Sequence, residues 1–308
     1  MLKFPVQYVV DFFKMFHVKQ TCGSFLQMFH VKQLQTERES AIILRAKERR
    51  AEMAKIIAVA NQKGGVGKTT TTVNLCAALT LLGKKILLTD CDPQGNATSG
   101  MGVSKQKTPG TYEMLISGAD VFSSISQTRY GDVIPAGRNL AAASIELGEL
   151  ESRERTLRNA LLPLFSDYDY ILIDCPPSLE LLTVNALTAA DSVLIPMQCE
   201  YYALEGIADL MTSIKLCKRR LNPRLDIEGI LLTMYDSRAN LTVQVANELR
   251  RYLPHKVYET VIPRSVRLSE APSHGKPGVV YEPSNRGSKA YMALAEEFLR
   301  KNSSDGTA

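Results

Sequence analysis

Short apolar runs and longer amphipathic segments succeed one another from residue 55 to residue 301. Most of the short runs are continuously apolar, a pattern that is typical of parallel strands covered on both faces. They predict strands over residues 55–60, 85–90, 131–135, 169–174, 192–196, 227–234 and 256–262. The longer segments predict helices over residues 69–82, 153–165, 179–190, 203–221, 239–252 and 287–301.

This alternation predicts the fold class. Strands and helices that follow one another in turn favour an α/β protein with a single doubly wound, mostly parallel sheet and helices on both faces. No linker rich in Pro, Gly or Ser divides residues 53–301, so we expect one domain there. Residues 302–308 are small and polar, and we expect a flexible tail.

Composition narrows the function classes only slightly. The chain has 308 residues, 45% of them hydrophobic, and a net charge of +5. Residues 1–52 hold nine Lys/Arg and five Asp/Glu, a difference of +4, so the remainder is nearly neutral and offers no global argument for nucleic acid. The six cysteines form no C-x-x-C pair, which favours reduced thiols, and no apolar run reaches transmembrane length.

The most specific motif joins the first predicted strand to the first predicted helix. Residues 63–70 read Lys-Gly-Gly-Val-Gly-Lys-Thr-Thr. Glycines in such a turn let backbone N–H groups converge on a phosphate, and the helix N-terminus adds partial positive charge. Lys68 is then placed to reach the β- and γ-phosphates, and the Thr69 hydroxyl to hold Mg²⁺. The general motif needs a glycine where Gln62 stands, and a second lysine, Lys63, begins the loop instead.

Acidic residues end two further predicted strands. Asp90 and Asp92 follow one apolar run, and Asp174 ends another. A single Asp after a strand is more often a helix cap or a turn residue. In an open parallel sheet, however, ligands bind beyond the carboxyl ends of the strands. We therefore expect these acids and the glycine-rich loop to converge on one phosphate site.

These motifs resemble a known family. The loop is similar to the deviant Walker A motif of the ParA/MinD superfamily of ATPases. DCDPQGNAT at residues 90–98 and LIDCPPS at 172–178 resemble the switch segments of chromosomal, Soj-type ParA proteins, and the likeness covers residues 53–301. It implies a P-loop fold, ATP and Mg²⁺ as cofactors, and slow ATP hydrolysis that a partner stimulates.

The resemblance also implies roles for individual residues. Asp92 would orient or activate the attacking water, Thr69 and Asp174 would hold Mg²⁺, and Lys63 would act on the nucleotide of the partner subunit in an ATP-bound homodimer. The nucleotide contacts that it implies are Lys63, Gly64, Gly65, Val66, Gly67, Lys68, Thr69, Thr70 and Pro263.

The partners follow from the same resemblance. Arg238 and Arg267 match positions at which Soj-type proteins bear DNA-binding arginines. The implied partners are non-specific double-stranded DNA and a ParB-type centromere-binding protein. The implied location of the protein is the cytoplasm, on the nucleoid, and no membrane partner is implied. A basic cluster also lies at the end of one predicted helix. It can be a solvated helix face or a DNA contact, and the sequence favours neither. The cluster comprises Lys215, Lys218, Arg219 and Arg220.

Two other functions compete with chromosome or plasmid partition. A MinD-like ATPase that cycles on membranes and positions the division site needs a C-terminal amphipathic helix, whereas no apolar stripe follows Leu299. A DNA scaffold without activity has no use for an intact set of Lys63, Lys68, Asp92 and Asp174. The sequence favours partition.

Residues 1–52 contain an unusual repeat. MFHVKQ at 15–20 recurs at 28–33 between unrelated flanks, whereas a structural repeat keeps its apolar pattern and varies its residues. Reverse translation permits TGTTTCACGTGAAACA, which equals its own reverse complement and resembles the parS site that ParB-type proteins bind. Arg49 and Arg50 permit AGG AGG, a ribosome-binding sequence, upstream of Met53. We therefore expect a non-native or disordered extension and a start at Met53; the alternative is a basic arm that aids DNA or partner binding.

Overall fold

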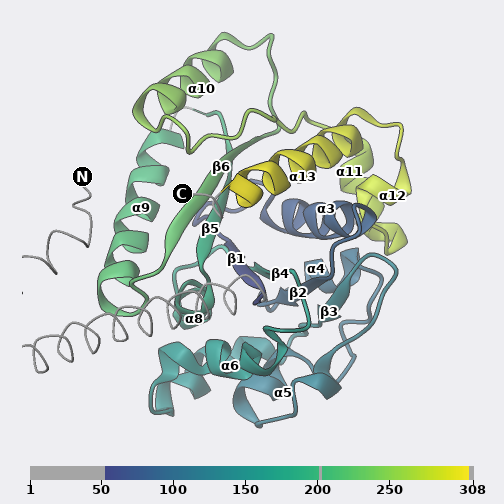
Figure 1. Cartoon of the computed structure of the whole chain (residues 1–308), viewed down its shortest axis with the longest axis vertical. Coiled ribbons are helices and arrows are strands. Elements are labelled where there is room, and N and C mark those ends of the chain that lie inside the picture. The colour runs from purple at the N-terminus through teal and green to yellow at the C-terminus, as the bar shows by residue number, and fades with distance from the viewer. Residues whose placement is uncertain (1–52, 201–202, 305–308) are drawn as a thin grey trace, which may run out of the picture. The chain divides into compact units, whose positions relative to one another are not determined.

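The computed structural model describes residues 53–200 and 203–304. Within these residues six strands form one sheet in the order β3-β2-β4-β1-β5-β6, and all neighbours are parallel (Figure 1). The strands are β1 (Lys55–Val59), β2 (Ile86–Asp90), β3 (Asp132–Ile134), β4 (Tyr170–Asp174), β5 (Ser192–Gln198) and β6 (Asp226–Thr233). The expected α/β fold class is confirmed. The expectations for residues 1–52 and 305–308 lie outside the described residues.

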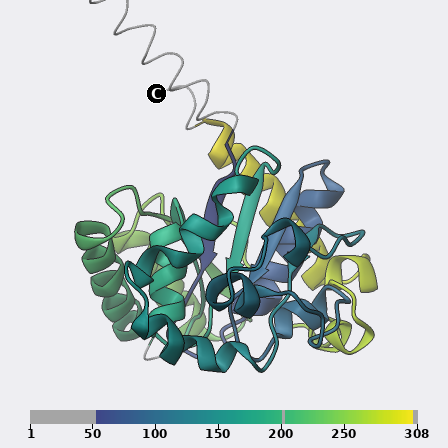
Figure 2. The ribbon, with the colours of Figure 1, turned by 90° about the horizontal axis from the view of Figure 1, so that it is seen from below.

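Helices cover both faces of the sheet (Figures 1 and 2). Ile57 and Val59 of β1 join a buried cluster with α3 (Lys68–Leu81) and α13 (Arg286–Ser304), which pack on each other. Ile56 and Ala58 point the other way, into a cluster with α6 (Leu140–Glu146), α7 (Thr156–Leu161), α8 (Leu181–Ala189), α9 (Ala203–Arg220) and α10 (Asn240–Tyr252). Because successive side chains of a strand point to opposite faces, burial on both sides requires the continuous apolar runs seen in the sequence.

The sequence pattern did not predict several short helices. They are α4 (Asn96–Gly100), α5 (Thr111–Ile116), α6, α11 (Val266–Glu270) and α12 (Gly278–Tyr281). Each has seven residues or fewer, too few turns to show helical periodicity. The single helix expected over 153–165 is wrong: 3₁₀ turns at Arg153–Arg155 and Leu162–Leu164 flank α7. Pro163 lies in the second turn and lacks the N–H that would continue the α-helix.

The strand expected over 256–262 is also wrong. This segment runs beside β6 and exchanges backbone hydrogen bonds with it, including Tyr258 N to Ile230 O at 2.9 Å, but forms only isolated bridges. The Glu297 carboxylate of α13 accepts from the N–H groups of Glu259 and Thr260 at 2.8 and 2.9 Å. Because a helix side chain takes these two donors, the backbone between the bridges does not continue the ladder.

The C-terminal tail begins later than expected. Residues 302–304 belong to α13, so the boundary at 302 is wrong. The Asn302 amide donates to Glu228 Oε1 at 2.8 Å, and its oxygen accepts from the Lys55 ammonium. These contacts join the last turn of the helix to β1 and β6. No helix among the described residues is long and apolar enough to cross a membrane.

Candidate functional site

The glycine-rich loop lies between the end of β1 and the start of α3, at the carboxyl edge of the sheet. Gly65 and Gly67 have φ of 74° and 88°, in the left-handed region that favours glycine, and Gly67 caps α3. The Thr233 hydroxyl at the end of β6 donates to the Val66 carbonyl at 2.8 Å, and Gln198 of β5 donates to Gly65 O at 3.3 Å. Two neighbouring strand ends therefore hold the loop in position.

Lys68 lies inside this loop. Its ammonium donates to the Lys63 carbonyl at 3.1 Å, and only 7% of the residue is exposed. Burial lowers the pKa of Lys68, while Asp174, Cys175 and Asp92 oppose that shift. The loop thus surrounds a positive group at a helix N-terminus, which is the chemistry that phosphate oxygens require.

Asp174 is fully buried, as is its neighbour Asp90. The strand register places it beside Val59 on one side and Asp90 on the other. Thr69 and Thr72 of α3 donate their hydroxyls to its two carboxylate oxygens, each at 2.8 Å. Burial, followed by the charge of Asp90, raises the pKa of Asp174 to about 8 although the hydroxyls lower it. A carboxylate and a hydroxyl held in contact are hard oxygen donors, so Thr69 and Asp174 fit Mg²⁺.

Asp92 begins the turn that follows β2. Its Oδ1 accepts from Gln94 N at 2.9 Å, and its own N–H donates to Asp90 Oδ1 at 3.1 Å. The other oxygen of Asp90 accepts both the N–H and the hydroxyl of Thr98, at 2.8 and 2.7 Å. Burial raises the pKa of Asp90 to about 6, against the effect of the Thr98 hydrogen bonds. Asp90 is therefore the internal anchor of the turn, and Asp92 is the nearer acid to solvent, at 8% exposure.

Lys63 lies at the outer end of the loop. Its side chain is 48% exposed and forms an ion pair with Glu200, which follows β5 and is 53% exposed. No sequence pattern indicated this partner, because 137 positions separate the two residues and Glu200 belongs to no phosphate-binding motif. Thr72 was missed for a similar reason: its hydroxyl points at Asp174 from one helical turn beyond the motif.

Pro263 is brought to the same edge of the sheet. It forms a parallel bridge with Tyr235, which follows β6, and the last residue of β6, Thr233, holds the glycine-rich loop. The remaining motif residues, Gly64 and Thr70, lie in the loop and in the first turn of α3. The structure thus gathers the expected nucleotide-site residues at one edge of the sheet.

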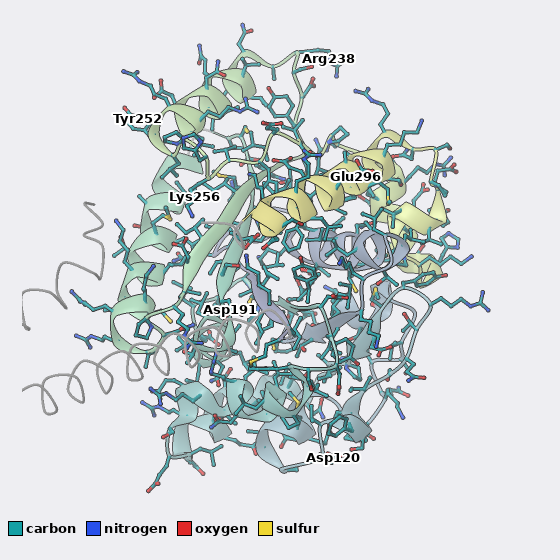
Figure 3. All side chains as sticks on the ribbon, in the orientation of Figure 1. Asp120, Asp191, Arg238, Tyr252, Lys256 and Glu296 are labelled. Atoms are coloured by element: carbon teal, nitrogen blue, oxygen red, sulfur yellow. The ribbon has the colours of Figure 1, made fainter. Side chains whose placement is uncertain are left out.

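The two arginines expected to bind DNA lie on separate elements. Arg238 is in the loop between β6 and α10, 88% exposed, and pairs with Asp236 at 2.9 Å (Figure 3). Arg267 is on α11, 54% exposed, and pairs with Glu270 at 2.8 Å. These hydrogen bonds raise the pKa of both guanidinium groups. Each arginine is exposed and charged, but its guanidinium group already forms an ion pair with a carboxylate of its own segment.

Comparisons with known proteins agree with this geometry. A family model described as an AAA domain matches residues 54–227. The Soj sporulation initiation inhibitor of Bacillus subtilis is 57% identical over 248 residues, which is 80% of this chain and 98% of that protein. The chain belongs to the Soj/ParA family of chromosome-partitioning ATPases.

Two further relatives extend the match. The chromosome-partitioning ATPase Soj of Thermus thermophilus is 48% identical over 259 residues, 84% of this chain and 98% of that protein. A solved cobyrinic acid a,c-diamide synthase from Mycobacterium smegmatis, with bound ADP and magnesium, superposes with a TM-score of 0.72 at 35% identity, covering 82% of this chain and 97% of that one. The expected family is confirmed, and with it the P-loop fold.

Proposed function

We propose that this Soj/ParA-family ATPase partitions a chromosome or plasmid by cycling between an ATP-bound dimer on DNA and a released monomer. One observation carries the proposal: Lys68, Thr69, Asp92 and Asp174 meet at one edge of the sheet, with Lys63 exposed beside them. ATP and Mg²⁺ are the cofactors that this donor set fits, and solved relatives carry them or their analogues.

The chain's own groups divide the work on the nucleotide. The N–H groups of residues 64–70 and the Lys68 ammonium bind and orient phosphates at the start of α3. Thr69 and Asp174 hold Mg²⁺, which neutralises phosphate charge when it is bound. Asp92 orients or activates the attacking water, and Pro263 contacts the nucleotide from the β6 side.

Dimerisation brings the positive charge of Lys63 to the nucleotide of the partner subunit. The Lys63 side chain is half-exposed, and its Glu200 partner is also exposed, so solvent screens the pair and the lysine can change partners. In an ATP-bound homodimer Lys63 contacts the nucleotide of the partner subunit. Because the group that stabilises transition-state charge is in place only in the dimer, hydrolysis is slow in the monomer.

DNA binding follows from the same dimer. Residues 53–308 are nearly neutral, so one subunit offers few phosphate contacts. Two subunits double the contribution of Arg238 and Arg267, which makes DNA affinity depend on ATP and, steeply, on salt. A ParB-type centromere-binding protein stimulates hydrolysis and releases the dimer, and the protein resides on the nucleoid. The competing function, membrane cycling of the MinD kind, predicts binding to anionic vesicles instead.

Gel shifts on unrelated duplexes, with ATP and Mg²⁺ at two salt concentrations, test this function. Wild type should bind every duplex with similar affinity, and binding should fall steeply at the higher salt. Arg238→Ala and Arg267→Ala should form ATP dimers that bind DNA at least tenfold more weakly, whereas Asp92→Ala should remain on DNA because hydrolysis fails. Equal DNA binding by wild type and both arginine variants overturns the DNA assignment. ATP-dependent binding to anionic vesicles in place of DNA favours membrane cycling.

A further inference from the structure

Lys105 lies outside every motif, in the loop between α4 and α5, yet it contacts the turn that carries Asp92. Its ammonium donates to the Gln94 carbonyl at 2.6 Å and to Asn96 Oδ1 at 3.1 Å. Its stem crosses Gly95, where an added Cβ would lie 3.2 Å from Lys105 Cγ and Cδ. One side chain therefore spans the turn between β2 and α4.

Gln94 links Lys105 to Asp92 because it forms a hydrogen bond with each of them. The Gln94 N–H donates to Asp92 Oδ1 at 2.9 Å, while the Gln94 carbonyl accepts from Lys105. The residue is thus held at both ends, by the acid on one side and by the ammonium on the other. Loss of the Lys105 ammonium removes one of these two contacts and leaves the Gln94 carbonyl without this donor.

The backbone of the turn also has hydrogen bonds of its own: the Gly95 N–H donates to the Asp92 carbonyl at 2.8 Å, and the Ser99 hydroxyl donates to the Gly95 and Asn96 carbonyls, each at 3.3 Å. Gly95 has φ of 60° and packs closely on the Ala136 carbonyl, 2.6 Å from where a Cβ would stand, so a larger residue cannot replace it. Gln94 and Asn96 are exposed. On this exposed side the Gln94 carbonyl and Asn96 Oδ1 accept from the Lys105 ammonium, and hydrogen bonds to a charged donor are the stronger ones.

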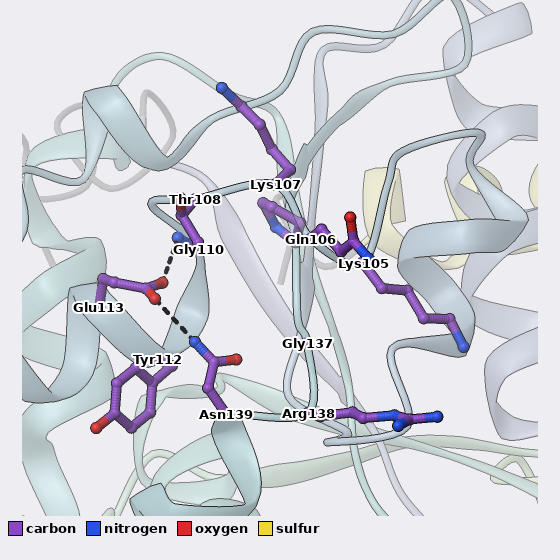
Figure 4. A pocket seen from close by; sticks show the side chains of 11 residues that line it. Lys105, Gln106, Lys107, Thr108, Gly110, Tyr112, Glu113, Gly137, Arg138 and Asn139 are labelled. Atoms are coloured by element: carbon purple, nitrogen blue, oxygen red, sulfur yellow. Dashed lines mark hydrogen bonds between the residues drawn. The ribbon is translucent and has the colours of Figure 1, made fainter.

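The surroundings of Lys105 leave its ammonium committed to the turn. Lys105 and Arg138 line one side of a hollow of about 560 Å³, and Glu113 lines the other (Figure 4). Both carboxylate oxygens of Glu113 are occupied, by Gly110 N and by Asn139 Nδ2, each at 2.8 Å. Within the described part of the chain Lys105 forms no ion pair that would compete with Gln94 and Asn96.

We propose that Lys105 is a positioning residue for ATP hydrolysis: it holds Gln94, which in turn holds the Asp92 carboxylate in the orientation that hydrolysis needs. The proposal rests on the function proposed above for Asp92. The hydrogen bonds of Lys105 in the described residues go to Gln94 and Asn96 and not to the phosphate-binding loop, so we expect it to act on turnover and not on nucleotide affinity.

The full chain with ATP and Mg²⁺ provides the test. Lys105→Met keeps the stem over Gly95 and removes the ammonium, whereas Lys105→Arg keeps the charge. We expect Lys105→Met to lower kcat about tenfold, the factor that one charge-assisted hydrogen bond contributes, with the Kd for ATP and the melting temperature unchanged. Lys105→Arg should recover most of the rate. Lys107→Met, two residues away in the same hollow, is the matched control and should turn over like wild type.

Three results would overturn the inference: an unchanged kcat in Lys105→Met, an equal loss in Lys107→Met, or a loss of ATP affinity that matches the loss of rate. Asp92→Ala, assayed beside them, separates the two hypotheses. If Asp92→Ala is inactive while Lys105→Met is normal, only the positioning role fails. If Asp92→Ala hydrolyses ATP normally, the role proposed for Asp92 fails as well.

Discussion

At the scale of single residues, Lys63 and Lys68 belong to one loop but lie in opposite environments, and this difference supports the separate roles proposed for them. Lys68 is 7% exposed and bound within its own loop, whereas the Lys63 side chain is 48% exposed and paired across the site with Glu200. The function proposed above assigns the buried ammonium to the nucleotide of its own subunit. It assigns the exposed one, whose ion pair is screened by solvent, to the nucleotide of the partner subunit.

Replacing Lys63 tests that difference. Lys63→Ala should bind ATP with near wild-type affinity, because Lys68, Thr69 and the loop amides are intact, but it should elute as a monomer on gel filtration with ATP and Mg²⁺. Glu200→Gln is the control: it removes the competing charge and keeps the lysine, so the dimer should form. A stable ATP dimer of Lys63→Ala would contradict the trans role.

At the scale of elements, buried acids join helices to the sheet. Glu228 of β6 has a side chain 5% exposed, pairs with Lys55 of β1 at 2.8 Å, and accepts from Ser192 of β5 and Asn302 of α13. Burial raises the pKa of Glu228, but Lys55, Ser192 and Asn302 outweigh that effect and lower it overall. One carboxylate thus connects three strands and the last turn of α13.

This network predicts a pH-dependent stability. Because the folded pKa of Glu228 lies below the unfolded value, its contribution is present above the unfolded pKa and is lost as the pH falls through the folded pKa. Glu228→Gln should lower the free energy of unfolding by about 1–3 kcal/mol at pH 7, and the deficit should shrink in acid below the ordinary glutamate range. Denaturant titrations at several pH values measure it.

Asp226 is the matched control on the same strand. Its side chain is 60% exposed, and its ion pairs with Lys256 and Lys218 lie at the surface. Asp226→Asn should cost well under 1 kcal/mol, since exposed ion pairs contribute little. Equal losses in the two variants, or a Glu228→Gln deficit that persists unchanged in acid, would refute the assignment to the buried carboxylate.

At the scale of the whole molecule, the structure and the comparisons concern the region that begins near Met53. The family model starts at residue 54, and 248 aligned residues of the 308 cover 98% of the Bacillus subtilis relative. The repeat of MFHVKQ in residues 1–52 lies outside the described residues. We propose that the repeat reflects a constraint on DNA: a palindromic site written twice would produce six identical residues between unrelated flanks, whereas a constraint on protein packing would keep the apolar pattern.

We predict that translation starts at Met53. N-terminal mass spectrometry of the native protein should then find the sequence that follows Met53, and the nucleotide sequence should spell the palindrome at both repeats. A chain that begins at Met53 should retain ATP hydrolysis and ATP-dependent DNA binding. Peptides from residues 1–40 in cells, or codons that do not form the palindrome, would contradict this prediction.

The sequence by itself determined the order of the main strands and helices and the phosphate-binding loop, because both depend on local patterns: continuous apolar runs for buried parallel strands, and glycines between a strand and a helix. It also indicated that acids ending the strands would converge, since parallel strands end at one edge. The shortest helices were beyond its reach, because they span too few turns to be periodic.

Only the tertiary structure decided which distant residues meet. It placed Asp90 beside Asp174, where burial raises the pKa of each and the charge of Asp90 raises that of Asp174 further. It also gave Lys63 its partner Glu200 and Gln94 its partner Lys105. It also turned the expected last strand into an irregular segment, because Glu297 of α13 takes two of its amides. Such pairings depend on which surfaces pack together, and a local pattern of apolar and polar residues carries no record of that.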